Sequence, residues 1–247
     1  MRIRTPFSYY GGKSKIVHLY PPPTHDLIIE PFAGSAAYAW YWASRANHSV
    51  WINELDPRTH SIWDFLINDS EALEKVRRYV PEKVVAGMKC ADIVPPEEHG
   101  LLELCRCEAN QGTQGGKGVH DQITGMGAKC WKIRRKMEEV IPVVSKWMLT
   151  QWDYQQVTNE DAYGQTKATW FIDPPYANPA GKRYRQSGID YATLAAYCQS
   201  RKGQVIVCEN LGADWLPFEP FDHKRVSIRS RYQKADAQEV IYYKESN

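Results

Sequence analysis

The sequence lacks the features that would assign it to a membrane, to the secretory pathway or to a disulfide-rich scaffold. No apolar run approaches the roughly 18 residues that a membrane span needs, and Met1–Arg4 leads into polar sequence instead of a signal-peptide core. Six cysteines in 247 residues are too few for a small disulfide scaffold. We therefore expect a cytosolic protein with free thiols.

An excess of charge of one sign is also absent. The 31 basic and 29 acidic residues give a formal charge of +2, so the total charge indicates no particular partner and the distribution matters more. A zinc site has little support, because Cys105 and Cys107 form a single Cys-x-Cys pair, with His99 and Cys130 nearby but no second close pair. We predict no metal.

The sequence does contain enough apolar material for one α/β domain with a sizeable insertion. Apolar residues make up 43% of the chain and aromatic residues 12%, which suffices for a folded core. Apolar runs that alternate with helical stretches predict a mostly parallel sheet, in which the last two strands form an antiparallel pair because no long helix separates them. The expected strands are 26–30, 49–53, 147–154, 169–172, 204–210, 221–230 and 239–244, with a late helix at 190–202 that stops at Gly203.

The most informative segment is Thr169–Tyr176, in which an apolar run stops on a carboxylate, two prolines and an aromatic residue. Pro174 and Pro175 cannot continue a hydrogen-bonded ladder, so Asp173 is expected at the carboxyl end of a buried strand. In open α/β sheets, ligands bind at that edge. The alternative is a strand followed by a rigid turn, with Tyr176 covering the core.

Two earlier segments have the small residues that let a backbone approach a ligand. Phe7–Lys15 contains Gly11-Gly12-Lys13 but lacks the first glycine and the preceding strand of a phosphate-binding Walker loop, and a flexible start with a solvated lysine is the alternative. Asp26–Ala37 predicts a strand that ends on Glu30 and turns through Gly34 into a helix, as in nucleotide-binding folds. Because Glu30 attracts cations and repels phosphate, the turn suits a ligand with an ammonium-like group.

Acidic residues end two further strands. Glu54 follows the second strand, at the distance from the first turn where such folds bind a ribose hydroxyl, although a solvated carboxylate is the alternative. Asp153 and Tyr154 close the third strand, and Asp153 can accept a hydrogen bond from an adenine amino group. These strand ends together predict a site for an adenosine-like ligand.

A long insertion, residues 58–145, separates the second and third strands. It includes a helical stretch at 60–80 and a Gly/Gln-rich segment that cannot form a regular helix. A cluster of cations follows this segment, and the alternative interpretation of that cluster is a solvated helix face. Cations recur after Tyr176, in a glycine-bounded stretch that predicts a mobile flap. Basic clusters of this kind suit a nucleic-acid backbone. The candidate contacts are Lys117, Lys129, Lys132, Arg134, Arg135, Lys182, Arg183 and Arg185.

Five motifs in this order resemble those of the Dam-type (alpha-group) DNA adenine N6-methyltransferases. They are Tyr10–Lys13, Glu30–Gly34, Asn53-Glu54, Asp153-Tyr154 and Asp173–Tyr176. The resemblance implies a Rossmann-like, S-adenosylmethionine-dependent methyltransferase sheet with an antiparallel C-terminal edge hairpin, formed by residues 1–57 and 146–247. It makes 58–145 an inserted target-recognition domain. It further implies S-adenosylmethionine as the cofactor, double-stranded DNA as the partner and the cytoplasm of a bacterial or phage-infected cell. We expect a monomer.

The resemblance also implies roles for single residues. The cofactor-binding positions are Tyr10, Lys13, Glu30, Phe32, Gly34, Glu54, Asp153 and Tyr154. Lys13 would reach the methionine carboxylate of the cofactor, Glu54 would take the ribose hydroxyls, and Asp153 with Tyr154 would lie beside the adenine. The catalytic positions are Asp173, Pro174, Pro175 and Tyr176.

The chemistry can also be argued from the residue types. The exocyclic amine of adenine is a poor nucleophile because its lone pair is delocalised into the ring. Asp173 and the Pro174 carbonyl can accept hydrogen bonds from that amine and localise the pair, while Tyr176 can stack on the base. Since a base inside a duplex cannot present its amine, we predict base flipping followed by direct methyl transfer, without a covalent intermediate.

One departure from the family concerns the DNA target. Members specific for GATC usually carry an Arg/Asn/Phe-rich hairpin, which is not intact in residues 111–126, so we expect relaxed specificity set by the backbone and the flap. A cytosine-N4 methyltransferase remains an alternative because the same motif suits any exocyclic amine, although Asp173 in place of Ser favours adenine. The sequence is also compatible with an RNA or single-stranded substrate, and with a non-catalytic nucleic-acid-binding protein of the same fold.

Overall fold

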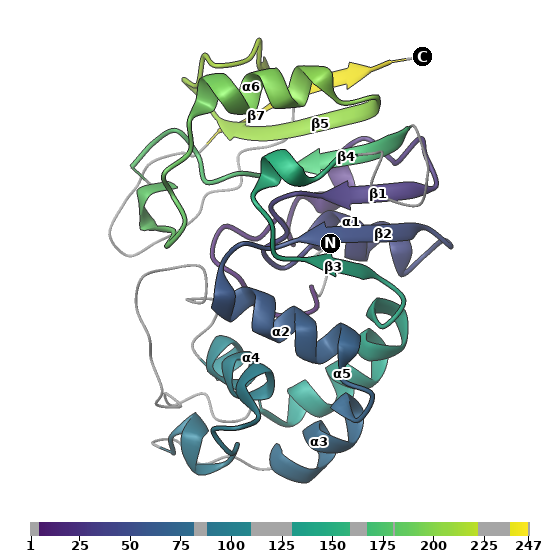
Figure 1. Cartoon of the computed structure of the whole chain (residues 1–247), viewed down its shortest axis with the longest axis vertical. Helices are drawn as coiled ribbons and strands as arrows, with labels where there is room; N and C mark the ends of the chain where they lie inside the picture. The colour runs from purple at the N-terminus through teal and green to yellow at the C-terminus, as the bar shows by residue number, and fades with distance from the viewer. Residues whose placement is uncertain are drawn as a thin grey trace.

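A computed structural model of the 247-residue chain describes residues 5–81, 88–109, 130–158, 167–179, 181–221 and 238–246. Strands and helices alternate at the start of the chain, and several helices then follow one another before the third strand (Figure 1). The strands are β1 Leu27–Glu30, β2 Ser49–Asn53, β3 Met148–Thr150, β4 Ala168–Ile172, β5 Gly203–Asn210, β6 Glu219–Pro220 and β7 Glu239–Glu245. The α-helices are α1 Ala37–Ala43, α2 Pro57–Asn68, α3 Ala72–Tyr79, α4 His99–Ala109, α5 Cys130–Val144 and α6 Tyr191–Ser200. Short 3₁₀ turns are η1 Val17–Leu19, η2 Cys90–Asp92, η5 Tyr154–Gln156 and η6 Gly181–Arg183.

The strands form one seven-stranded sheet in the order β3-β2-β1-β4-β5-β7-β6. Strands β1 to β5 run parallel to one another, β7 is antiparallel to β5, and β6 is antiparallel to β7. This arrangement confirms the predicted α/β class and the mostly parallel sheet with an antiparallel C-terminal edge. The chain reverses its direction of travel across the sheet between β1 and β4, and the carboxyl ends on either side of that reversal are where such sheets bind ligands.

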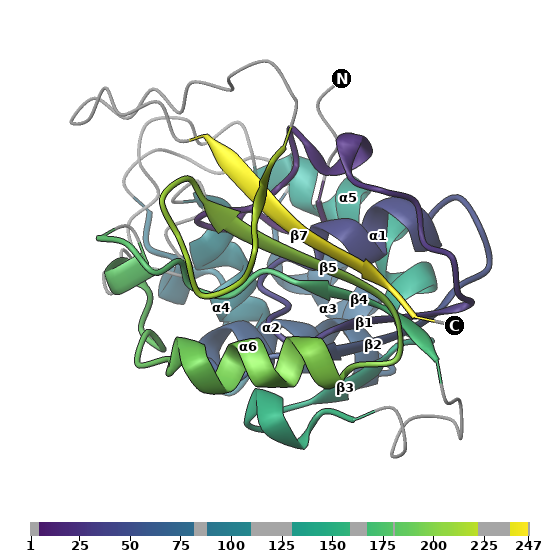
Figure 2. The same cartoon turned by 90° about the horizontal axis from the view of Figure 1, so that it is seen from above.

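Both faces of the sheet are buried, because successive strand residues point to opposite sides. On β1, Ile28 belongs to one apolar cluster while Leu27 and Ile29 belong to the other, and on β4 Phe171 and Trp170 divide in the same way. Helix α6 covers the second face and α1 covers the first, as the view from above shows (Figure 2). This burial on both faces explains the nearly continuous apolar runs of the strands.

Helices α2 to α5 lie together beside the β3 edge of the sheet (Figure 1). Their buried residues, such as Trp63, Leu101 and Val140, join the same apolar cluster as the face of the sheet that α1 covers. The Gly/Gln-rich part of the insertion lies outside the described residues. The assignment of 58–145 as a target-recognition domain therefore stays a prediction. Among the described residues, no helix is both long and apolar enough to cross a membrane.

The structure differs from the sequence-based prediction at four places. The strand expected at 147–154 is only β3 Met148–Thr150, and Tyr154 begins the turn η5. The helix expected at 60–80 is two helices, because Asp69 accepts a hydrogen bond from the backbone N–H of Glu71 and the chain turns there. Gly203 does not end helix α6 but begins β5, with a φ of 97° that favours glycine. At the edge, β7 pairs with the short β6 as well as with β5, and most of the strand expected at 221–230 lies outside the described residues.

Candidate functional site

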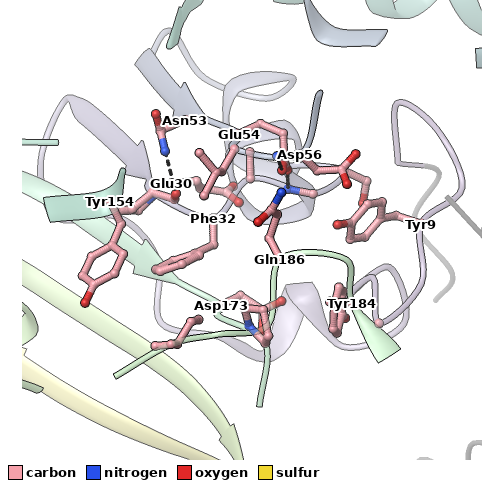
Figure 3. Close-up of a pocket in the computed structure, with 18 of the residues that line it drawn as sticks. Tyr9, Glu30, Phe32, Asn53, Glu54, Asp56, Tyr154, Asp173, Tyr184 and Gln186 are labelled. Atoms are coloured by element: carbon pink, nitrogen blue, oxygen red, sulfur yellow. Dashed lines mark hydrogen bonds between the residues drawn. The ribbon is translucent and has the colours of Figure 1, made fainter. Parts of the chain in front are cut away.

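A cavity of about 290 Å³ lies at the carboxyl ends of the parallel strands. The residues that follow β1, β2, β3 and β4 line it, together with the N-terminal loop 9–13 and the segment 184–190. All eight expected cofactor-binding residues line this cavity, and so do Asp173 and Pro175, whereas Pro174 and Tyr176 do not. Phe32 and Tyr154 lie at one end of the cavity and Tyr9 and Tyr184 at the other (Figure 3).

The turn after β1 is shaped to expose its backbone. Gly34 has a φ of 50°, which glycine adopts at little cost, and Ala36 has a φ of 45°, which is uncommon for a residue with a side chain. A Cβ at Gly34 would also lie 2.7 Å from the Tyr9 ring. The indole N–H of Trp63 on α2 donates to the Gly34 carbonyl at 2.8 Å, so the helical region holds the turn in place.

Two buried glutamates hold this turn from either side. Glu30 accepts a hydrogen bond from the Ala39 N–H at 2.6 Å and so caps the start of α1. Glu54 accepts from the N–H of Gly34 at 2.8 Å and from that of Asp56 at 2.9 Å. Burial raises the pKa of Glu30 well above its usual range and that of Glu54 to about 7. Both side chains therefore order the protein itself, in addition to any contact with a ligand.

An aromatic group forms the end of the cavity beside β3. The rings of Phe32 and Tyr154 lie 5.2 Å apart between centroids, and Trp152, which also lines the cavity, is 39% exposed. Asp153 turns the chain by accepting a hydrogen bond from the Gln155 N–H at 2.9 Å. A flat apolar group such as a purine would fit between rings of this kind.

Asp173 directly follows β4 and forms a buried ion pair. Lys13 donates to Asp173 Oδ1 at 2.8 Å and to the Tyr176 hydroxyl at 2.6 Å. Lys13 is 7% exposed and the Asp173 side chain 22%. Burial raises the pKa of Asp173 to about 6, against the opposing effect of Lys13. Lys13 thus engages the predicted catalytic carboxylate, whereas the family resemblance implied a cofactor carboxylate as its partner.

The two acceptors that the proposed chemistry requires are free among the described residues. Lys13 occupies Oδ1 of Asp173, while Oδ2 makes no hydrogen bond to any residue the structure describes. The same holds for the carbonyl oxygen of Pro174, whereas that of Pro175 accepts from the Tyr191 hydroxyl at 2.7 Å. Asp173 lines the cavity, whereas Pro174 is buried and does not, so of these two acceptors the structure presents the one on Asp173 to the cavity.

Glu239, the first residue of β7, is a member of this site that the sequence did not reveal. Its Oε1 accepts hydrogen bonds from the hydroxyls of Tyr20 at 2.5 Å and Tyr176 at 2.9 Å, and lies 3.3 Å from Lys13 Nζ. The pKa of Lys13 is well above its usual range, because Asp173 and Glu239 together outweigh the effect of burial. No motif pointed to Glu239, which lies 63 positions after Tyr176.

The segment after Tyr176, residues 177–190, closes one side of the cavity. Gly181 approaches the Tyr176 backbone so closely that a Cβ would lie 1.9 Å from its carbonyl oxygen. The Tyr184 hydroxyl donates to the Tyr10 carbonyl at 3.1 Å, and Arg185 forms a bidentate ion pair with Asp56, at 2.5 and 2.7 Å. These contacts tie the predicted flap to three separate parts of the site.

The expected nucleic-acid contacts divide into different groups. Lys117 and Lys129 lie outside the described residues, as does the side chain of Lys132. Arg134 binds the backbone carbonyls of Arg77 and Val80 at the end of α3, and Arg185 pairs with Asp56. Arg135 is exposed on α5, 3.9 Å from Glu139. Lys182 and Arg183 are exposed on the flap, in the turn η6.

Acidic groups dominate the lining of the cavity. Its carboxylates are Glu30, Glu54, Asp56, Asp153, Asp173 and Asp190, and its cations are Lys13 and Arg185. Since both cations are paired with carboxylates of the site, the lining favours a ligand that carries positive charge. The described residues contain no cluster of three or more His, Cys, Asp or Glu side chains arranged for a metal, and Cys105 and Cys107 are buried in α4.

Comparison with known proteins adds no family to this picture. A scan against protein-family models found no match, and a search of curated proteins found no similar sequence.

Proposed function

We propose that this protein is an S-adenosylmethionine-dependent DNA methyltransferase that acts on the N6 amine of adenine. The observation that carries the proposal is the single cavity lining shared by the Gly34 turn, Glu54, Asp153 and the Asp173 strand end. With Tyr10 and Lys13, which also line the cavity, these residues come from five motifs spread over more than 160 positions, and the resemblance to Dam-type enzymes requires them to meet. The antiparallel edge strand agrees with the same resemblance.

The charge of the cavity supports this cofactor. S-adenosylmethionine carries an adenosine, a positively charged sulfonium and an ammonium group, and the lining combines an aromatic end with six carboxylates. A nucleotide with a phosphate chain would be repelled by the carboxylates that stay ionised, since burial raises the pKa of Glu30 well above its usual range and that of Glu54 to about 7. When bound, the cofactor supplies an electrophilic methyl group.

The protein's own part in the reaction is to orient and polarise the amine. Asp173 Oδ2 and the Pro174 carbonyl accept hydrogen bonds from the two N–H groups, which localises the nitrogen lone pair. Proline at positions 174 and 175 fixes the direction of that carbonyl. Lys13 keeps Oδ1 engaged, so a single oxygen of Asp173 faces the substrate.

The substrate reaches this site as an extruded base. The flap carries Lys182 and Arg183 beside the cavity, where they can contact the phosphates of a duplex whose base has been flipped. Contacts of this kind carry no sequence information. They fit the relaxed specificity expected from the missing recognition hairpin.

Transfer of a labelled methyl group from S-adenosylmethionine to DNA tests the proposal. We expect the wild-type protein to label duplex DNA and nucleoside analysis to identify N6-methyladenine. Asp173→Asn keeps the size of the side chain but removes its charge, and should lower kcat by about 10²- to 10³-fold while cofactor binding persists. Asp26→Asn, at the opposite end of β1, is the matched control and should behave like wild type.

Each competing function has its own outcome in this assay. N4-methylcytosine as the product would replace the adenine assignment. Preferential labelling of RNA or single-stranded DNA would replace the duplex. Binding of DNA without any methyl transfer would indicate the non-catalytic protein, and equal transfer by wild type and Asp173→Asn would remove Asp173 from the chemistry.

A further inference from the structure

Glu239 and its partners form a buried hydrogen-bonded group that extends the site beyond its motifs. One oxygen, Glu239 Oε1, faces three donors: Tyr20 at 2.5 Å, Tyr176 at 2.9 Å and Lys13 at 3.3 Å. The Glu239 side chain is 13% exposed and Lys13 is 7% exposed. A carboxylate withdrawn from water in this way is costly unless it is paired, and these three donors satisfy it.

The contacts of Glu239 restrict where the Lys13 ammonium can lie relative to Asp173. Lys13 donates to Asp173 on one side and lies against Glu239 on the other, so its ammonium is held between two carboxylates. Tyr176 is held in the same way, since it accepts from Lys13 and donates to Glu239. Without Glu239, the long and flexible lysine would be free to swing toward either oxygen of Asp173.

We propose that Glu239 is a positioning residue of this site, which holds Lys13 and Tyr176 so that Lys13 engages only Oδ1 of Asp173. The second oxygen, Oδ2, is thereby kept for the substrate amine. The consequence of this role for catalysis rests on the proposed function. The effect of Glu239 on Asp173 does not, because it is present in the protein without a ligand. Glu239 does not touch the substrate and acts through Lys13.

Glu239 also affects the pKa of Asp173 through its charge. The negative charge of Glu239 acts to raise the pKa of Asp173, so its removal should lower that pKa below about 6. The titratable and charged groups that act with Asp173 in this region are Lys13, Glu30, Glu209, Glu239, Tyr20, Tyr176, Tyr184 and Cys208. Of these, Glu239 is the carboxylate that shares the Lys13 ammonium with Asp173.

The test compares three variants of the full-length protein. Glu239→Gln removes the charge, Glu239→Asp keeps the charge but shortens the side chain, and Glu245→Gln makes the same change as the first at the exposed far end of β7. Two measurements are made on each: the pH dependence of kcat with labelled S-adenosylmethionine and duplex DNA, and titration of the Asp173 carboxyl carbon by NMR without ligand. Thermal unfolding establishes that each variant is folded.

For Glu239→Gln we expect kcat to fall at least about tenfold at pH 8, and the acid limb of the pH profile to move down by about one unit. The NMR titration of Asp173 should move in the same direction. Glu239→Asp should lower kcat but leave the acid limb near its wild-type position, because the charge remains. Glu245→Gln should match wild type in both measurements. A role in folding alone would lower the melting temperature without moving the Asp173 titration.

The outcomes separate this inference from the proposed function. If wild type transfers methyl groups and folded Glu239→Gln is equally active with an unmoved Asp173 titration, the inference is overturned and the function stands. If wild type transfers no methyl group, the function fails, and the NMR titration alone still decides whether Glu239 acts on Asp173. Should Glu239→Gln not fold, wild-type kcat in Glu239→Asp would overturn the positioning role.

Discussion

The amide of Asn53 makes four hydrogen bonds to segments that follow or end neighbouring strands. Its nitrogen donates to the carbonyls of Pro31 at 3.1 Å and Trp152 at 3.0 Å, and its oxygen accepts from the Thr150 hydroxyl at 2.8 Å and the Trp152 N–H at 2.9 Å. This one side chain therefore fixes the relative positions of the loops after β1 and β3. Those loops carry Phe32 and Asp153 on the cavity lining.

Asn53→Ala should destabilise the protein by about 3 kcal/mol, because it leaves several buried donors and acceptors without partners. Urea unfolding monitored by tryptophan fluorescence measures the change. Asn210→Ala, at the end of β5, is the control, since the structure gives that side chain no hydrogen bond among the described residues. A loss for Asn53→Ala no larger than that of the control would show that the four bonds contribute little.

The buried carboxyl group of Glu54 makes the free energy of unfolding decrease as the pH rises. Its pKa is raised from 4.5 to about 7 in the folded protein, so between these values the folded state binds more protons than the unfolded state. The contribution of Glu54 to the free energy of unfolding is then largest below pH 4.5 and is lost as the pH rises through 7, by an amount on the order of 3 kcal/mol. Asp173, with its pKa raised to about 6, acts in the same direction.

The pH dependence can be isolated with Glu54→Gln. The free energy of unfolding of wild type minus that of the variant should decrease between pH 5 and pH 8, because the neutral amide does not titrate. Unfolding by urea at several pH values measures this difference. A difference that stays constant over the range would mean that Glu54 has an ordinary pKa.

Sequence reasoning at this scale found the residues that stand in motifs and missed those that act through distant partners. Glu30, Glu54 and Asp173 each end an apolar strand, which is a local signal. Glu239 and Asp56 gain their importance from Lys13 and Arg185, far away in the chain, and no local pattern records such a pairing. The expected partner of Lys13 was likewise a ligand, whereas the described structure pairs it with two carboxylates.

At the scale of elements, the flap depends on the close approach of Gly181 to Tyr176. A Cβ at position 181 would lie 1.9 Å from the Tyr176 carbonyl oxygen, whereas a Cβ at Gly188 would meet no atom within 4 Å. The two glycines lie seven positions apart in the same segment. They therefore form a matched pair for testing how tightly the flap is held.

Gly181→Ala should destabilise the flap by about 1–3 kcal/mol, because the backbone must move to admit the methyl group. Limited trypsin cleavage after Lys182 and Arg183 should become faster, and the melting temperature should fall. Gly188→Ala should leave both unchanged. Equal cleavage of the two variants would indicate that the contact at Gly181 does not hold the flap.

Strands were easier to predict than helix boundaries for a physical reason. The parallel strands β1, β2, β4 and β5 are buried on both faces, so each reads as an apolar run ended by polar or rigid residues. The break between α2 and α3 depends on a single side-chain contact at Asp69, which the helical pattern does not display. The sequence predicted an antiparallel pair between the last two strands, but neither the pairing of β7 with β5 nor the extent of β6.

At the scale of the whole molecule, the acidic cavity should discriminate between adenosine compounds by charge. S-adenosylmethionine at 100 times its Kd should stabilise the protein by about 2.7 kcal/mol, measured as a rise in melting temperature. ATP shares the adenosine but carries a phosphate chain, and we expect it to give a much smaller rise at equal concentration. Stabilisation by ATP equal to that by S-adenosylmethionine would contradict the assignment of the cavity.

The contact between Lys13 and Glu239 has a consequence for the order in which function appears during synthesis. Lys13 and all five motifs have been translated once the ribosome passes Tyr176, yet the carboxylate that holds Lys13 is still more than sixty codons away. A nascent chain could thus fold β1 to β4 and form most of the cavity while its lysine remains unanchored. The site gains its last anchor only when β7 joins the sheet, so we expect an unfinished or truncated chain to be impaired in the proposed methyl transfer.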